Sequence, residues 1–206
     1  ETMSKTVSKQ DKNTTPLFGD AGTASLITKG KNFGFSFFNL NSDGSGCDIL
    51  KVPYGGYRNP SCKEGFEEIV DDNGNVLTGE QLHMDGMNVF NFGLRVVPTS
   101  IKKVVEYAGK EMSQVDVILF HQANKFMTDF FAKKLKFSLN KVPYSLDRYG
   151  NTSAASIPLN VVSEMYNTSN FTVRDNVVMA GFGAGLSWGT CLLSLASTII
   201  SPLIEY

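Results

Sequence analysis

Residues 117–124 read VILFHQAN, a short apolar run that ends at His121 and leads into a helical pattern. Such a run is typical of a strand buried inside a sheet. The apolar side chains of residues 123–135 recur at helical spacing, and two lysines stand near the end of this segment, where the helix dipole favours cations. Because ligands of open α/β sheets bind beyond the carboxyl ends of the strands, His121 is predicted to face a ligand site.

Strands and helices alternate on both sides of this segment. Apolar residues at steps of three and four predict an amphipathic helix from Phe90 to Ala108, with Pro98 as a kink or as a break between two helices. A further helix is expected over residues 153–166. Strands are expected over residues 115–120, 142–146, 176–180 and 186–195. This order predicts a mixed α/β layer structure.

The amino-terminal part of the chain is less regular. Residues 1–15 are polar with few apolar anchors, which predicts an exposed arm. Residues 17–27 combine small side chains with an apolar finish and predict a turn that leads into a buried strand, and residues 33–40 form a second β-like run. Residues 41–80 are rich in Gly, Asn, Asp and Pro, so a loop-rich connector with a hairpin around residues 72–74 is expected.

Composition limits the classes of function. The chain has 206 residues, enough to bury a core, and a formal charge of −1, which offers no basic face for nucleic acid. Cys47, Cys62 and Cys191 are irregularly spaced, so neither a disulfide framework nor a metal site is indicated, and a cytoplasmic compartment is expected. The most apolar stretch, residues 191–200, is shorter than the roughly 20 residues of a membrane helix. No signal peptide is visible, and Glu1 is interpreted as a cut end.

Three polar motifs follow apolar runs. They are His121, Asn151 within YGNTSAASIP at residues 149–158, and the glycine-rich turn GFGAG at residues 181–185. Each also has a purely structural interpretation: a satisfied histidine, a turn and N-cap, and a tight hairpin that needs positive φ. The small residues 153–156 let the following helix approach a ligand or another backbone closely. Together, a ring nitrogen, a carboxamide and turn N–H groups can hold negative charge on a thioester oxygen.

These motifs identify a family by resemblance. HQAN at residues 121–124, GNTSAASIP at 150–158 and GFGAGLSWG at 181–189 closely resemble the carboxyl-terminal half of beta-ketoacyl-acyl-carrier-protein synthase III. Residues 17–24 and 41–44 also match segments of that family. The resemblance covers nearly the whole chain apart from the loop at residues 61–80 and the tail after Ala196.

The resemblance implies a thiolase-like layered α/β/α fold made of two similar halves. Residues 1–80 would then be the trailing strands and connector of the amino-terminal half, and residues 81–206 would be the carboxyl-terminal half. Members of the family usually form homodimers, so a homodimer is expected for the full-length enzyme.

The resemblance also implies a reaction, the decarboxylative Claisen condensation of an acyl-CoA primer with malonyl-acyl-carrier protein in fatty acid biosynthesis. His121 and Asn151 would donate hydrogen bonds to the thioester oxygen, and the backbone N–H of Ala184 would form the oxyanion hole for acyl transfer. A buried His121 should have a lowered pKa and be neutral. The family's nucleophilic cysteine should lie upstream of Glu1, because the three cysteines of this chain stand in turn-rich loops or in a β core. The 206 residues alone are therefore expected to form no acyl-enzyme.

Binding residues follow from the same resemblance. The substrates would be acyl-CoA and malonyl-acyl-carrier protein, without a cofactor or metal and without nucleic acid or membrane as partner. CoA or its pantetheine arm would be bound by Gly86, Phe90, Ala123 and Asn124. Acyl carrier protein would dock on Lys133 and Lys134.

Several positions depart from the family pattern. Met87 stands where an asparagine is usual, Asn91 where a lysine is common, and Phe126 where an arginine is common. Losing basic residues at this rim should weaken the attraction for an acidic carrier protein or for the phosphoadenosine end of CoA. Ala184 replaces a glycine in the oxyanion turn. The identity of the primer is therefore left open.

Two alternative classes remain. One is a related condensing enzyme of the same fold, such as a polyketide-type synthase or a hydroxymethylglutaryl-CoA synthase, although the NTSAAS run at residues 151–156 favours the ketoacyl synthase III type. The other is a non-catalytic homologue that has lost the nucleophile and serves as a dimer partner. The residues encoded upstream of Glu1 would distinguish an enzyme from such a partner.

Overall fold

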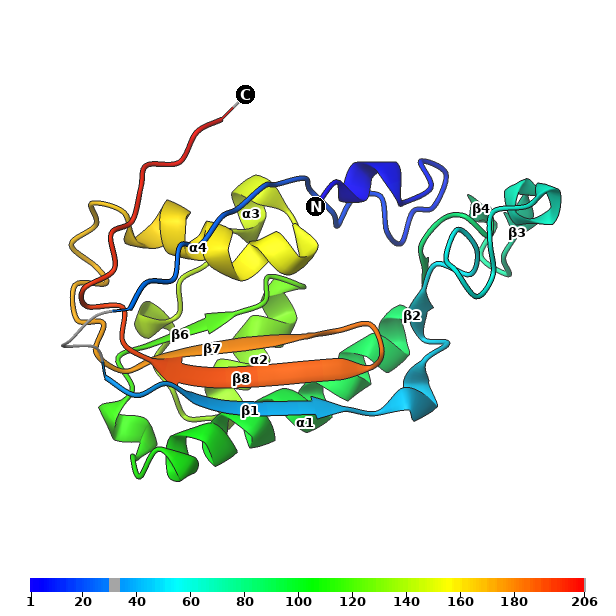
Figure 1. Ribbon diagram of the computed structural model, residues 1–206. Helices are drawn as coiled ribbons and strands as arrows, with labels where there is room; N and C mark the ends of the chain where they lie inside the picture. Colours follow the sequence, from blue (N-terminus) through cyan, green and yellow to red (C-terminus); the bar gives the residue numbers. More distant parts are fainter. Residues whose placement is uncertain (30–33, 206) are drawn as a thin grey trace.

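A four-stranded sheet forms the centre of the molecule (Figure 1). The computed structural model describes residues 1–29 and 34–205. The strands of this sheet are β1 (Phe37–Ser42), β6 (Val117–Phe120), β7 (Val177–Gly183) and β8 (Ser187–Leu193). Their spatial order is β1-β8-β7-β6. β6 runs parallel to β7, whereas β8 runs antiparallel to both β7 and β1.

Helices cover both faces of the sheet. The α-helices are α1 (Gly86–Tyr107), α2 (Lys125–Lys134), α3 (Leu146–Tyr149) and α4 (Ser156–Met165). In Figure 1, α1 and α2 lie on one face of the sheet, and α3 and α4 lie on the other. The predicted α/β layer structure is confirmed, as are the predicted strands at residues 115–120, 176–180 and 186–195, within a few residues at each end.

The position of β6 in the molecule explains why its sequence is entirely apolar. Ile118 and Phe120 belong to the core between the sheet and helices α1 and α2, whereas Val117 and Leu119 belong to the core on the side of α4. All four side chains are buried. A strand covered on both faces has no polar side to present, so a continuous apolar run replaces the usual alternation.

Helix α1 runs through Pro98 without a break, so the alternative of two separate helices is wrong. Asp85 begins the helix, because its carboxylate accepts a hydrogen bond from the Asn88 N–H. Pro98 has no N–H to donate to the Leu94 carbonyl one turn earlier. Lys134 of α2 supplies that donor, with its Nζ 3.2 Å from the Leu94 oxygen.

The segment before α3 differs from the prediction. A strand was expected over residues 142–146, but these residues pair with none of the described strands. Pro143 cannot donate to a ladder, and its carbonyl instead accepts from Asn160 Nδ2 of α4 at 3.0 Å. Val142 is buried in this loop, so its apolar character reflects packing rather than a strand.

The amino-terminal segment also differs from the prediction. Residues 1–15 are not an exposed arm, because Ser8, Asp11 and Thr14 are buried and Ser8 Oγ donates to the Val76 carbonyl. The strand expected within residues 17–27 is neither formed nor buried; Leu26 is 91% exposed. A segment becomes a strand only where it can pair with another strand, and no described strand pairs with this segment.

A loop-rich connector joins the sheet to α1, as predicted. It contains two short antiparallel pairs, β2 (Leu50–Lys51) with β5 (His83–Met84) and β3 (Ile69–Val70) with β4 (Val76–Leu77). The second pair is the hairpin expected around residues 72–74, with Gly74 at a φ of 75°. In Figure 1 this hairpin projects away from the sheet.

Strand β1 comes from the first of the two expected segments and pairs with β8 from the second. The sheet therefore spans the division expected at residue 80, and that division stays a prediction. The predicted β-like run began at Phe33, which lies outside the described residues; the observed strand begins at Phe37. Within residues 1–29 and 34–205, no helix is long and apolar enough to cross a bilayer.

Candidate active site

His121 follows β6 directly and lies at the carboxyl end of the strand, as predicted. Its backbone N–H donates to the Ala180 carbonyl of β7 at 2.8 Å, which continues the parallel pairing by one residue. Its side chain lines a cavity of about 480 Å³. Burial lowers the pKa of His121 from 6.5 to about 4, so the ring is neutral at pH 7.

The His121 ring is held on two sides. Its Nδ1 lies 2.7 Å from the hydroxyl oxygen of Ser156, the first residue of α4. The Phe182 ring of β7 packs against it edge to face, with the ring centroids 5.4 Å apart and the planes at 81°. Since Nδ1 is engaged by Ser156, Nε2 is the nitrogen left for a ligand.

Asn151 is fixed through both its backbone and its side chain. Its N–H donates to the Leu17 carbonyl at 2.8 Å, and its carbonyl accepts from the Gly19 N–H at 3.1 Å. Its side-chain oxygen Oδ1 accepts from the Ser153 N–H at 2.9 Å. The Nδ2 NH₂ group is therefore the part of the carboxamide that remains free to donate. The turn-forming interpretation of Asn151 is confirmed, and the functional interpretation stays a prediction that the turn geometry permits.

The loops that hold Asn151 cross at van der Waals contact. A Cβ placed on Gly19 would lie 2.0 Å from the Tyr149 carbonyl oxygen. Gly150 has a φ of 65°, and a Cβ there would lie 3.1 Å from the Leu17 carbonyl oxygen. Glycine is required at both positions, because a larger residue would separate the two backbones and move Asn151.

The glycine-rich motif forms the end of β7 and the turn into β8. β7 extends to Gly183 and β8 begins at Ser187, so Ala184, Gly185 and Leu186 make the turn itself, with Gly185 at a φ of 133°. Ala184 lines the same cavity as His121 and Asn151. The three predicted catalytic positions, which are scattered in the sequence, therefore converge on one cavity.

The wall of this site cavity is mostly apolar. All four residues expected to bind CoA or pantetheine line it: Gly86, Phe90, Ala123 and Asn124. Asn124 also begins α2, because its side chain accepts from the Phe126 N–H at 2.8 Å. The remaining apolar wall is formed chiefly by Met3, Leu17, Phe18, Leu50, Leu82, Met84, Val89 and Met127.

The two lysines expected to dock a carrier protein lie at the end of α2 and do not line the site cavity. Lys133 is exposed. Lys134 donates to the Leu94 carbonyl and lies over the Phe130 ring, with Nζ 5.9 Å from the ring centroid. Docking by these lysines stays a prediction, and Lys134 has a structural role besides.

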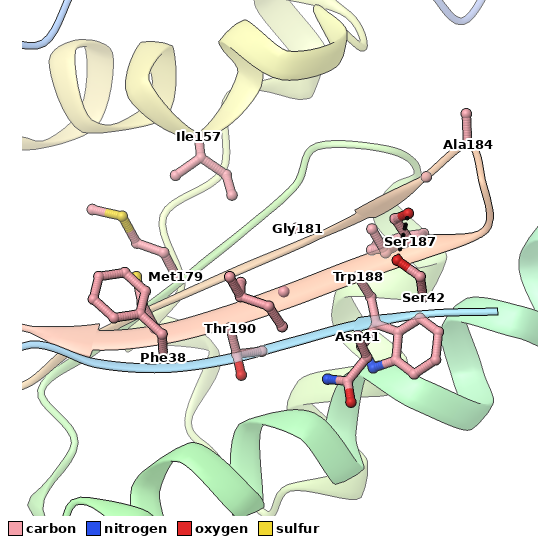
Figure 2. A pocket seen from close by; sticks show the side chains of 15 residues that line it. Phe38, Asn41, Ser42, Ile157, Met179, Gly181, Ala184, Ser187, Trp188 and Thr190 are labelled. Carbon is pink, nitrogen blue, oxygen red and sulfur yellow. Dashed lines mark hydrogen bonds between the residues drawn. The ribbon is translucent and has the colours of Figure 1, made fainter.

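A second hollow, the sheet groove, lies over the face of β1, β7 and β8 beside α4. Figure 2 shows Ile157 of α4 pointing toward the sheet, with Phe38 and Met179 nearby. The sheet groove meets the site cavity at Gly181–Ala184, which line both. Cys191 lines the groove, and burial raises the pKa of its thiol.

No cysteine among the described residues lines the site cavity. Cys47 is exposed and Cys62 is partly buried, and both stand in the connector. No group of three or more His, Cys, Asp or Glu side chains in the described part of the chain could hold a metal ion.

Sequence reasoning missed two supporting residues. Gln122 is buried, donates from Nε2 to the Phe120 carbonyl at 2.9 Å and accepts from the Ser145 N–H at 3.1 Å. It thereby ties the loop after β6 to the loop before α3. Ser156 had been noted only as a small residue. A polar residue directly after an apolar strand was the available signal for Gln122, whereas no local pattern indicated the contact of Ser156.

Comparisons with known proteins agree with this geometry. Residues 105–195 match the family model described as 3-Oxoacyl-[acyl-carrier-protein (ACP)] synthase III C terminal, and residues 1–44 match 3-Oxoacyl-[acyl-carrier-protein (ACP)] synthase III. The beta-ketoacyl-[acyl-carrier-protein] synthase III of Clostridium tetani is 36% identical over 193 residues, which cover 94% of this chain and 57% of the relative. That of Clostridium acetobutylicum is 38% identical, over 94% of this chain and 56% of the relative.

Solved structures give the same result. The 3-oxoacyl-(acyl-carrier protein) synthase from Burkholderia xenovorans has a TM-score of 0.84 and 35% identity, over 100% of this chain and 57% of that chain. A crystal structure of a 3-oxoacyl-(acyl-carrier-protein) synthase III has a TM-score of 0.81 and 32% identity, over 93% and 57%. The chain thus has the thiolase fold of these structures and spans a little over half of their length.

Proposed function

Because this chain belongs to the 3-oxoacyl-[acyl-carrier-protein] synthase III family, we propose that it forms the carbonyl-activating part of a condensing enzyme. That enzyme would join an acyl-CoA primer to malonyl-acyl-carrier protein by decarboxylative Claisen condensation in fatty acid biosynthesis. The observation that carries the proposal is the convergence of His121, Asn151 and the Ala184 turn on one apolar cavity.

The two side chains stabilise the charge that decarboxylation creates. When malonyl thioester loses CO₂, the electron pair of the broken C–C bond moves onto the thioester oxygen as an enolate. The Nε2–H of a neutral His121 and the Nδ2–H of Asn151 donate hydrogen bonds to that oxygen. In an apolar cavity such fixed donors act in a low dielectric, and each is worth on the order of 3 kcal/mol.

The turn between β7 and β8 acts in the second half of the reaction. The carbanion attacks the carbonyl of the acyl group held on the enzyme, and the carbonyl oxygen becomes negative. The backbone N–H of Ala184 donates to that oxygen. The acyl group would be carried by a cysteine upstream of this chain, since Cys47, Cys62 and Cys191 all lie outside the site cavity.

The apolar wall fits the flexible arm that carries both thioesters. Gly86 and Phe90 of α1 line the cavity together with Ala123 and Asn124, which directly precede α2. A pantetheine chain would lie along these residues. Phe90 packs on Phe126, with ring centroids 5.8 Å apart. At the start of α2, Lys125 is paired with Asp129 at 2.9 Å rather than free for a phosphate. Acyl carrier protein as partner, a homodimer and a cytoplasmic location belong to the same proposal.

Decarboxylation of malonyl-acyl-carrier protein by the full-length encoded enzyme tests the function. His121→Ala and Asn151→Ala should each lower the rate by roughly 10²–10³. His83→Ala is the matched control, because His83 bonds to the Thr78 carbonyl in the connector and does not line the site cavity. An unchanged rate in the His121→Ala, Asn151→Ala double variant would refute the proposal.

A further inference from the structure

Ser156 stands at the junction between helix α4 and the catalytic strand end. It is 2% exposed and is the first residue of α4. Its Oγ lies 2.7 Å from His121 Nδ1 and 3.4 Å from the backbone nitrogen of Gln122. A single buried hydroxyl therefore contacts both the catalytic ring and the backbone that follows it.

The direction of the short hydrogen bond follows from the proton count. The Gln122 N–H can only donate, so it occupies an acceptor position on Ser156 Oγ. The hydroxyl has one proton of its own, and among the described residues its only acceptor within hydrogen-bond distance is His121 Nδ1. If Nδ1 carried the hydrogen instead, the buried hydroxyl proton would have no partner, which is unfavourable.

We propose that Ser156 is a positioning residue whose hydroxyl donates to His121 Nδ1 and thereby places the imidazole hydrogen on Nε2, facing the site cavity. The ring cannot satisfy this contact after turning over, because a ring carbon would then face the hydroxyl. Phe182, packed edge to face on the ring, restricts that rotation.

Residues 153–156 also hold the acceptor atom of Asn151. The Ser153 N–H binds the acceptor atom of the carboxamide, and the Ser156 hydroxyl binds the acceptor atom of the imidazole. Both catalytic side chains are thus left with only a hydrogen-bond donor toward the site cavity. The small-residue run at residues 153–156 therefore has a chemical role. The imidazole of His121 and the carboxamide of Asn151 can each donate or accept a hydrogen bond, and this run leaves both of them as donors.

Nitrogen-15 NMR of the imidazole rings in the full 206-residue chain tests the proposal without any substrate. At neutral pH His121 should show a protonated Nε2 and an unprotonated, hydrogen-bonded Nδ1. In Ser156→Ala the Nδ1 resonance should shift toward that of a nitrogen without a hydrogen bond, and the Nδ1–H tautomer should become populated. Ser156→Thr keeps the hydroxyl and should retain the wild-type pattern. His83→Gln assigns the second histidine.

Ser163→Ala is the matched control. Ser163 lies on the same helix, and its buried hydroxyl has no hydrogen-bond partner among the described residues, so its loss should leave the His121 signals unchanged. The proposal is overturned if wild-type Nδ1 carries the hydrogen, if Ser156→Ala leaves Nδ1 unshifted, or if Ser163→Ala shifts it equally.

The catalytic meaning of Ser156 rests on the proposed function, and a second measurement separates the two. In the full-length enzyme Ser156→Ala should lower kcat for decarboxylation by roughly tenfold at unchanged KM, because one hydrogen bond that orients the donor is lost. If the wild-type enzyme does not decarboxylate malonyl-acyl-carrier protein, the proposed function fails while the NMR result still decides the tautomer. If kcat is unchanged in Ser156→Ala, the positioning role fails while the function stands.

Discussion

His121 has the properties of a hydrogen-bond donor rather than of a proton carrier. A group that takes up and releases a proton at neutral pH works best with a pKa near 7. Burial instead lowers the pKa of His121 to about 4, so the ring keeps one fixed hydrogen across the physiological range. A neutral donor can stabilise an enolate oxygen without transferring its hydrogen to it and quenching the carbanion.

The lowered pKa of His121 predicts a pH dependence of folding. The unfolded chain protonates this ring below about pH 6.5, whereas the folded chain resists protonation down to about pH 4. Between these values the unfolded state binds more protons, so the free energy of unfolding should decrease as the pH falls, by at most about 1.4 kcal/mol per pH unit. Urea unfolding at several pH values in this window measures the slope.

The His121→Gln variant isolates this contribution. Carboxylates that titrate in the same range are common to both proteins, so the difference between the two slopes belongs to the ring. The variant should lose less stability on acidification than the wild type. Equal slopes for the two proteins would show that His121 titrates normally in the folded state.

At the residue scale, the sequence predicted which residues converge on the site cavity but not the residues that hold them in place. His121, Asn151 and Ala184 stand in compact motifs whose chemistry is readable locally. Ser156 is separated from His121 by the whole of α2 and α3, and it is one of many serines in the chain. Contacts between distant segments depend on how the elements pack, which a linear pattern does not contain.

At the scale of elements, the crossing of two loops decides where the carboxamide lies. The backbone of residues 17–19 hydrogen-bonds to both sides of Asn151, and the close approach leaves no room for a Cβ on Gly19. The crossing is the only described β-bridge that ties residues 1–29 to the loop after α3. The position of the Asn151 amide is therefore set by a segment that carries none of the proposed catalytic residues.

Gly19→Ala should destabilise the fold by about 1–3 kcal/mol and displace Asn151, because the new methyl group would overlap the Tyr149 carbonyl oxygen. Gly22→Ala is the control, since a Cβ on Gly22 meets nothing within 4 Å. Thermal unfolding and the amide NMR signal of Asn151 measure the two effects. The loop crossing would be contradicted if the two variants had the same unfolding temperature and the same Asn151 amide signal.

Helices α1 and α2 are joined by a hydrogen bond that a proline makes necessary. Pro98 frees the Leu94 carbonyl, and Lys134 Nζ donates to it. Lys134→Met should therefore destabilise the wild type by about 1 kcal/mol but have less effect in Pro98→Ala, where a backbone N–H returns to that carbonyl. A double-mutant cycle from chemical unfolding measures the coupling, and additive effects would contradict it.

Helices were predicted more accurately than strands, for a physical reason. The helix at residues 86–107 buries one face of its own regular pattern, so its period is visible in the sequence. A strand exists only when another strand lies beside it. Residues 142–146 and 17–27 have strand-like composition, yet neither pairs with a described strand. Val142 of the first segment is buried and Leu26 of the second is exposed, and composition alone does not distinguish these two outcomes.

At the scale of the whole molecule, the site cavity is assembled from distant parts of the chain. Met3 and Phe18 come from the amino-terminal segment, Leu50 and Met84 from the connector, and His121 from the sheet. The walls contributed by Met3, Leu50 and Leu82 were not foreseen, because nothing local marks them as cavity residues. The layered fold and the family were foreseen, since three motifs occur in the expected order.

The distribution of cysteines predicts the outcome of acylation. After incubation of the 206-residue chain with acetyl-CoA, intact-mass measurement should show no stable acyl adduct. Cys47 is exposed but far from the donors in sequence and absent from the site cavity, and burial raises the pKa of Cys191, which disfavours its reactive thiolate. A stable adduct on the isolated chain would refute the proposal that the nucleophile lies upstream.

The loop crossing at Gly19 also bears on the order of events during synthesis. Residues 17–19 leave the ribosome more than a hundred residues before Asn151, their partner. Strand β1 is likewise synthesised long before β8, the strand with which it pairs. Contacts of such long sequence separation form slowly, because the intervening chain must close first. Helices α1 and α2, whose contacts are local, would therefore form in the nascent protein before the Asn151 amide finds a fixed place.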